Sequence, residues 1–358
     1  MSTATTTPID EAKLQAFLGK AVGDFGTAAS AALVAIGDKV GLYKAMAGAG
    51  PLTSAELAQR TGTVERYVRE WLVNQAAAGY LEYDPSNGRY TLPPEHALAL
   101  TDETSPFYVG GGYQVITAAM KAQPRIAEAF RSGAGLSWGE QDPDLFEGTE
   151  RFFRPGYMAN LVSSWIPALE GVEARLQAGA TVADVGCGHG ASTIVMAKAY
   201  PRSRFFGFDN HAPSIARARQ AAAEVGVAER IIFEVASATD FPGRDYDLIA
   251  YFDCLHDMGD PVGAIRHARE TLAPDGTALI VEPMAGERVE DNFNPVGVVY
   301  SAASVLVCTP NALSAGHGIA LGTVATEAQL RAVVTAGGLS RFRRAAETPF
   351  NRIFEARP

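Results

Sequence analysis

The chain is 358 residues long and carries a formal net charge of −10, with 47% hydrophobic and 20% charged residues. This composition is ordinary for a globular protein, and the length is enough for two domains of about 100–200 residues each. The acidic balance argues against nucleic acid or an anionic membrane surface as the main partner, because both require a basic footprint. The apolar runs at 28–36 and 298–308 are shorter than the roughly 18 residues of a membrane span, so we expect no membrane partner.

The N-terminus and the cysteines predict a cellular compartment. Residues 1–8 are Thr-rich and lack the basic region and apolar core of a signal peptide. Cys187, Cys254 and Cys308 lie far apart and form no CxxC pair. This usage favours reduced thiols over a disulfide framework or a zinc site. We therefore expect a cytoplasmic protein without a metal.

Residues 9–100 read as helices that end in a β-hairpin. Two apolar helix faces come first, formed by Leu14, Phe17, Leu18 and Val22 and by Leu33, Ile36, Val40 and Tyr43. A capping box at 53–56 starts a short helix, and a second helix runs from about Val64 to Gly79. Residues 80–92 then read as strand, turn and strand. This order predicts a winged helix.

A winged helix suggests DNA binding, but its charges do not support that function. Over residues 53–78, three arginines (Arg60, Arg66, Arg69) are offset by three glutamates (Glu56, Glu65, Glu70). A module that neutralises several phosphates needs a net basic surface. We therefore expect no nucleic-acid partner, and we interpret this part as a packing module that forms a homodimer through the apolar helices.

The next stretch, residues 101–171, reads as helices separated by a Gly/Trp/Pro-rich loop at 133–143. Its aromatic residues have mostly helical spacing, which is typical of a core. We nevertheless expect Tyr157 and Trp165 to border a pocket over the following domain. The predicted boundaries are 1–100 for the winged helix, 101–171 for a helical connector and 172–358 for the last domain.

The last domain alternates strands and helices. Five apolar runs read as strands, at 181–185, 204–209, 230–235, 246–252 and 277–282, with helices starting near Ala191, Pro213 and Pro261. This alternation predicts an α/β fold with a doubly wound, Rossmann-like parallel sheet. Residues 340–347 and 350–357 add an antiparallel hairpin, which brings the sheet to seven strands.

A glycine-rich turn follows the first of these strands. Gly186, Gly188 and Gly190 alternate after Asp184, where glycine permits a tight turn and close approach to a ligand. Asp209 ends the next strand, where an acid can bind two ribose hydroxyls. Together these residues indicate a cofactor that contains adenosine.

Two such cofactors compete. Gly186, Gly188 and Ala191 satisfy the GxGxxG/A pattern of a dinucleotide site. S-adenosyl-L-methionine (SAM) requires an acid before a GxGxG turn, which Asp184 and Gly190 supply, and small polar residues after the third strand, as at 236–240. We expect SAM, with NAD as the alternative.

Residues 253–260 follow the fourth strand and contain His256 and Asp257, and Glu282 ends the fifth strand. Ligands bind at the carboxyl ends of such strands, so these side chains should meet there. A histidine oriented by a carboxylate can accept a proton from a hydroxyl group. A metal reading of Cys254, His256 and Asp257 finds no second ligand cluster at zinc-like spacing.

These motifs resemble class I SAM-dependent methyltransferases. The order of domains is similar to small-molecule O-methyltransferases with an N-terminal winged-helix dimerisation domain, and segments 253–261, 281–283 and 291–297 resemble their actinobacterial branch. The resemblance implies that His256 is the general base, supported by Asp257 and Glu282. It also implies that Ser237 replaces the family's adenine-binding acid, which leaves Asp240 to bind the adenine amine.

The predicted function is methyl transfer from SAM to a small molecule, with O-methylation expected. The alternatives are a winged-helix regulator that binds SAM and an NAD-dependent oxidoreductase. The predicted cofactor-binding residues are Asp184, Gly186, Gly188, Gly190, Asp209, Asn210, Ser237, Ala238, Asp240 and Asp253. The predicted acceptor pocket is formed by Tyr157, Trp165, Phe293, Tyr300 and Asn311.

Overall fold

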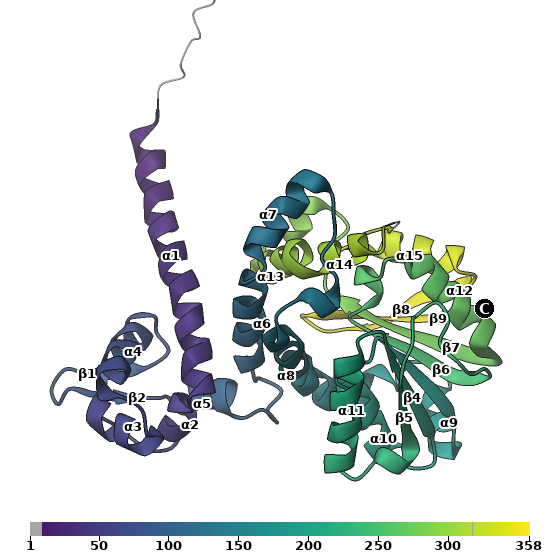
Figure 1. The fold of residues 1–358 in the computed structure, drawn as a ribbon, viewed down its shortest axis with the longest axis horizontal. Coiled ribbons are helices and arrows are strands. Elements are labelled where there is room, and N and C mark those ends of the chain that lie inside the picture. The colour runs from purple at the N-terminus through teal and green to yellow at the C-terminus, as the bar shows by residue number, and fades with distance from the viewer. Residues whose placement is uncertain (1–8, 317) are drawn as a thin grey trace, which may run out of the picture. The chain divides into compact units, whose positions relative to one another are not determined.

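The computed structural model describes residues 9–316 and 318–358, and these residues divide after Tyr113 into two compact units (Figure 1). The division follows Tyr113, whereas the sequence predicted boundaries near residues 100 and 171. The Thr-rich residues 1–8, for which we expected no signal peptide, lie outside the described residues.

The N-terminal unit has the predicted winged-helix order. Its elements are α1 (Glu11–Lys39), α2 (Leu42–Met46), α3 (Ser54–Thr61), α4 (Glu65–Ala77), β1 (Glu82–Asp84), β2 (Arg89–Thr91) and α5 (Pro94–Thr101). The capping box of Thr53 and Glu56 starts α3 as predicted. Glu56 also binds Arg89 of the hairpin, with 2.7 Å between Oε2 and Nη1, so the same carboxylate ties α3 to β2.

The long helix α1 packs on a face that matches the predicted one only in part. Ser30, Ala31, Val34 and Gly37 are its buried residues and Leu33 packs partly against the same core, while Ile36 and Val40 are exposed. The cause is Trp71 of α4, whose indole N–H donates to the carbonyl of Leu33 at 2.8 Å. A Cβ at Gly37 would lie 2.5 Å from the same ring, so only glycine admits the indole there.

The C-terminal unit is built on the predicted α/β sheet. Its strands are β3 (Thr181–Val185), β4 (Arg204–Asp209), β5 (Ile231–Val235), β6 (Tyr246–Phe252), β7 (Leu272–Pro283), β8 (Arg341–Glu347) and β9 (Asn351–Arg357). Their order is β5-β4-β3-β6-β7-β9-β8, with β5, β4, β3, β6 and β7 parallel and β9 antiparallel to both β7 and β8. The chain reverses its direction of winding at β3, where ligands bind in such sheets.

Helices cover both faces of this sheet (Figure 1). One core contains residues of α8 (Pro143–Asn160), the π-helical turn Leu161–Trp165, α9 (Val172–Ala178), α10 (Ala191–Ala199) and α11 (Ala212–Glu224). The other contains residues of α12 (Pro261–Thr271) and α15 (Glu327–Ala336). The sheet is therefore buried on both sides, which explains its nearly continuous apolar strands.

The remaining helices are α6 (Gly110–Met120), α7 (Gln123–Ser132), α13 (Pro295–Ala303) and α14 (Thr309–Ser314), with a π-helical turn at Ser304–Cys308 between the last two. α13, this turn and α14 form the continuous helical stretch Pro295–Ser314, whose length and mean hydropathy of 1.5 would allow a membrane span. The expectation that no stretch is long enough was therefore wrong, because its interrupting residues are uncharged. Core helices of soluble proteins meet the same criteria, and the lack of a membrane partner stays a prediction.

Candidate functional site

The glycine-rich turn after β3 has the shape that its sequence predicts. Gly186, Gly188 and Gly190 have φ angles of 76°, 52° and 80°, which side chains with a Cβ rarely adopt. A Cβ at Gly190 would lie 2.6 Å from the ring of Phe233, whereas a Cβ at Gly188 would meet no atom within 4 Å. The turn is therefore packed on one side and open at Gly188.

Asp184, at the end of β3, holds the glycine-rich turn through hydrogen bonds to the helix that follows it. Its carboxylate is fully buried, and Oδ2 accepts hydrogen bonds from the hydroxyls of Ser192 and Thr193, both at 2.6 Å. These bonds attach the first turn of α10 to the end of β3. Oδ1 is buried without a partner among the described residues, and burial raises the pKa of Asp184 to about 6.

Asp209 lies beside the turn at the end of β4. Oδ2 accepts from the backbone N–H of Gly188 at 2.9 Å, and Oδ1 accepts from that of His211 at 2.8 Å. Each carboxylate oxygen has a second lone pair that can still accept a hydroxyl proton. Burial raises the pKa of Asp209, and Asn210 beside it is exposed.

The loop after β5 lies at the same edge of the sheet. The N–H of Ala236 donates to the carbonyl of Asp209 at 3.1 Å, which ties this loop to the end of β4. Ser237 and Asp240 are exposed there, and Ala238 is half-buried. The structure thus brings the predicted adenine-binding segment next to the predicted ribose acid.

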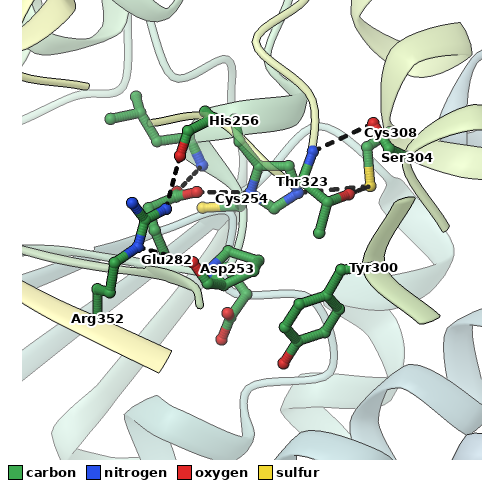
Figure 2. Close-up of polar contacts among 12 residues, drawn as sticks. Asp253, Cys254, His256, Glu282, Tyr300, Ser304, Cys308, Thr323 and Arg352 are labelled. Atoms are coloured by element: carbon green, nitrogen blue, oxygen red, sulfur yellow. Dashed lines mark hydrogen bonds and ion pairs between the residues drawn. The ribbon is translucent and has the colours of Figure 1, made fainter. Parts of the chain in front are cut away.

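His256 and Glu282 form a buried pair at the ends of β6 and β7 (Figure 2). Nδ1 of His256 lies 2.7 Å from Oε2 of Glu282, and Oε1 accepts from the N–H of Leu255 at 3.1 Å. Both side chains are buried, at 3% and 1% exposure. Burial alone would lower the pKa of His256, but Glu282 and Cys308 outweigh it and hold that pKa well above its usual value.

The carboxylate that orients the imidazole is Glu282 and not Asp257. Among the described residues, hydrogen bonds reach the His256 ring from Glu282 and Cys308. Asp257 is half-buried beside them, its carbonyl accepts from Asn311 at 3.0 Å, and burial raises the pKa of its carboxyl to about 7.

Sequence reasoning missed two residues on the other side of the imidazole. Sγ of Cys308 lies 3.4 Å from Nε2 of His256, and the hydroxyl of Thr323 donates to the same sulfur at 3.2 Å. Cys308 belongs to an apolar helix and Thr323 to a glycine-rich loop, and neither context carries a recognisable motif. Only the folded chain reveals that Cys308 covers Nε2 and that Thr323 supports Cys308.

Sequence reasoning also missed Arg352 and Asn351 of β9. Arg352 is fully buried opposite Glu282 in the strand register, and its guanidinium donates to the carbonyls of Pro283 and Ala325 at 2.9 and 2.7 Å. It brings a positive charge close to the Glu282 carboxylate (Figure 2). An arginine in the middle of a predicted strand was the signal that could have found it.

Asp253 lies in an enclosed polar position. It has a φ of 52°, and its carboxyl accepts from the hydroxyl of Tyr157 at 3.2 Å and from the amide of Asn351 at 2.7 Å. Burial, with Glu282 nearby, raises the pKa of Asp253 to about 8. These contacts place Asp253 between α8 and β9.

The five predicted pocket residues occupy different environments. Tyr157 contacts Asp253, and Tyr300 is buried with its hydroxyl donating to the Phe350 carbonyl at 2.9 Å. Trp165 is only 1% exposed and belongs to the core, in contact with Tyr157. Phe293 is 78% exposed because it follows a surface turn just before α13. The side-chain oxygen of Asn311 accepts a hydrogen bond from the backbone N–H of Trp138 at 2.8 Å.

Comparison with known proteins supports this reading of both units. Residues 28–102 match the model of the Rv2258c-like winged HTH domain, and residues 176–317 match that of a methyltransferase domain. The 27-O-demethylrifamycin SV methyltransferase of Amycolatopsis mediterranei is 29% identical over 141 residues, which is 39% of this chain and 46% of that protein. The chain thus spans less than half the length of the curated relatives that it matches.

Solved structures resemble the chain over nearly its full length. The mitomycin 7-O-methyltransferase has a TM-score of 0.71 at 19% identity, covering 97% of this chain and 100% of that one. Human N-acetylserotonin methyltransferase, solved with SAM, has a TM-score of 0.68 at 19% identity and covers 99% of both chains. These likenesses establish the fold, including its mixed seven-stranded sheet.

Proposed function

We propose that the chain is a SAM-dependent methyltransferase with an N-terminal winged helix-turn-helix domain and that it methylates a hydroxyl group of a small molecule. The observation that carries this proposal is the buried His256–Glu282 pair, which lies at the strand ends next to the glycine-rich turn. Two similar proteins are named for methyl transfer to an oxygen position, on a demethylrifamycin and on mitomycin, which supports a hydroxyl acceptor.

The residues around the glycine-rich turn suit SAM. The open side of the turn at Gly188 leaves room for a ligand, and the remaining lone pairs of Asp209 can accept two ribose hydroxyls. The exposed Ser237 and Asp240 lie at the same edge for the adenine. When bound, SAM supplies a methyl group on a positively charged sulfur, and the protein has to align the acceptor with it.

His256 is the proposed general base. Glu282 accepts the Nδ1 proton, so the neutral imidazole carries its lone pair on Nε2, which can take the proton of the acceptor hydroxyl. Cys308 now lies against Nε2, so an acceptor oxygen must take the place of its sulfur. Arg352 keeps a positive charge near the carboxylate of Glu282.

The N-terminal unit is proposed to form a homodimer and not to bind DNA. Arg66 and Arg69 pair with Glu70 and Glu65 along α4, which leaves this helix without a free basic face. The apolar side chains of α1 are exposed instead, at Leu14, Phe17, Leu18, Val22 and Phe25. Light scattering should find a dimer, and Phe17→Glu with Phe25→Glu should yield a folded monomer. A monomeric wild-type protein would rule out the dimer.

The three cysteines are free thiols, which supports a cytoplasmic location for the proposed enzyme.

Calorimetric titration with SAM, its demethylated product and NAD tests the cofactor. We expect micromolar binding of the first two and loss of that binding in Asp209→Ala. Glu224→Gln removes an exposed carboxylate near the far end of α11 and should bind SAM as the wild type does. Binding of NAD in place of SAM would contradict the proposal.

A further inference from the structure

A second chemical capacity lies around the imidazole of His256. A ring nitrogen of His256, Sγ of Cys308 and a carboxylate oxygen of Asp257 all lie within 4.8 Å of one another. Nitrogen, thiolate sulfur and carboxylate oxygen are the ligands that Zn²⁺ binds in proteins. The sequence suggested Cys254 as the cysteine ligand of such a site. It did not suggest Cys308, because 52 residues separate Cys308 from His256.

The distance between the two strongest ligands already suits a metal. With Zn–S of about 2.3 Å and Zn–N of about 2.0–2.1 Å, the sulfur and nitrogen of a tetrahedral site lie about 3.6 Å apart. Nε2 of His256 and Sγ of Cys308 are 3.4 Å apart. Binding therefore requires little movement of these two residues, whereas the Asp257 carboxylate has to move closer.

The residues behind these ligands also have the arrangement of a metal site. Histidines that bind metals almost always donate their other ring N–H to a carboxylate or carbonyl, which fixes the tautomer. Glu282 lies 2.7 Å from Nδ1 of His256 and can accept that bond, so the neutral ring would have the lone pair of Nε2 facing Cys308. The hydroxyl of Thr323 donates to Sγ at 3.2 Å and supports a negative charge on the sulfur (Figure 2). Asp257 is half-buried, whereas His256 and Cys308 are buried.

We propose that His256, Cys308 and Asp257 form a binding site for a thiophilic divalent cation, with Zn²⁺ as the expected ion and a fourth position open to water. On binding, the Cys308 thiol loses its proton to solvent and its sulfur bonds the metal, while Nε2 donates its lone pair. The consequence for catalysis rests on the proposed function: a metal on Nε2 occupies the general base, so bound Zn²⁺ inhibits methyl transfer.

Cobalt titration of the full-length, tag-free protein tests the site without SAM or acceptor. We expect one equivalent of Co²⁺ to produce a thiolate-to-cobalt charge-transfer band, which Zn²⁺ then abolishes because it binds more tightly. Cys308→Ser should lose the band, while Cys254→Ser, a matched change of a nearby thiol, should keep it. Circular dichroism checks whether each variant folds.

Two further variants keep the test decisive if Cys308→Ser does not fold. Asp257→Asn should weaken Co²⁺ binding at least tenfold, and Glu282→Gln should weaken it about 10–100-fold through loss of the bond to Nδ1. Wild-type protein without the band, or a band that persists in Cys308→Ser, would overturn the site. Because the band needs neither SAM nor acceptor, the metal site and the proposed methyl transfer can fail independently.

Discussion

Nδ1 of His256 lies 2.7 Å from Oε2 of Glu282, and the two residues come from the ends of neighbouring parallel strands. A parallel sheet brings such ends together, although 26 residues separate this pair in the chain. Both groups are buried, so each would be costly to charge alone, and the contact lets the imidazole hold a proton beside a carboxylate. That capacity is what a general base requires.

Replacing His256 should slow methyl transfer without removing the cofactor. With a hydroxyl acceptor, we expect His256→Ala to lower kcat about 10²–10⁴-fold, the usual contribution of a positioned acid or base. SAM affinity by calorimetry should change little. His267→Gln serves as the control, because His267 lies on α12 and bonds the carbonyl of Phe241, outside the site. Unchanged turnover in His256→Ala would remove His256 as the base.

The rate should rise with pH. Because the pKa of His256 is held above its usual value, the neutral imidazole gains population only as pH increases beyond neutrality. At saturating SAM and acceptor, kcat should therefore rise and then level off. Glu282→Gln removes the carboxylate that favours the imidazolium, so its half-maximal rate should occur at lower pH. A profile of Glu282→Gln that coincides with the wild type would show that another group controls the rate.

Two glycine substitutions should separate folding from cofactor binding. A Cβ at Gly207 of β4 would lie 2.4 Å from the Phe233 ring, so Gly207→Ala should lower stability by about 1–3 kcal/mol through overpacking. Gly188→Ala meets no neighbour within 4 Å and should cost only the strain of its positive φ, about 1–3 kcal/mol at most, yet it should abolish SAM binding. Denaturant unfolding and calorimetry measure the two effects. Normal SAM binding by folded Gly188→Ala would place the cofactor elsewhere.

The protein without cofactor should become less stable as pH rises. Asp253 has a pKa of about 8, well above its usual 3.8, so the folded state holds a proton that the unfolded state has lost. The stability from this proton is complete below about pH 4 and is lost as pH rises through about 8. Asp184 and Asp257, with pKa values of about 6 and 7, act in the same direction.

Thermal unfolding between pH 5 and 9 measures this dependence. Asp253→Asn has no proton to lose, so its Tm should fall less over this range than that of the wild type. The exposed Asp275→Asn should retain the full decrease. Equal slopes for the wild type and Asp253→Asn would show that Asp253 is ionised in the folded state.

Most of the fold follows from local patterns in the sequence. The bounds of β3, β4 and β6 coincide with the apolar runs that predicted them, and the capping box begins α3 as predicted. Such features depend on neighbours in the chain. The packed face of α1 was predicted only in part, because Trp71, which is distant in sequence, packs against the face that carries Gly37.

The site divides in the same way. The pair of His256 and Glu282 could be predicted because both residues follow strands, and strand ends meet in a parallel sheet. Cys308 and Thr323 could not, because the segment between β7 and α15 has no period that fixes its path over the sheet. Phe293 illustrates the same difficulty, since an aromatic residue of that segment proved to be exposed.

The segment between β7 and α15 also allows acceptor specificity to change independently of cofactor affinity. It supplies Tyr300 and Cys308, whereas the glycine-rich turn and Asp209 belong to the other half of the sheet. On the proposed function, mutations in this segment would alter which acceptor reaches His256 while they preserve cofactor affinity. Divergence to new substrates would then proceed through this one segment, and exchanging it between relatives would be a route to altered specificity.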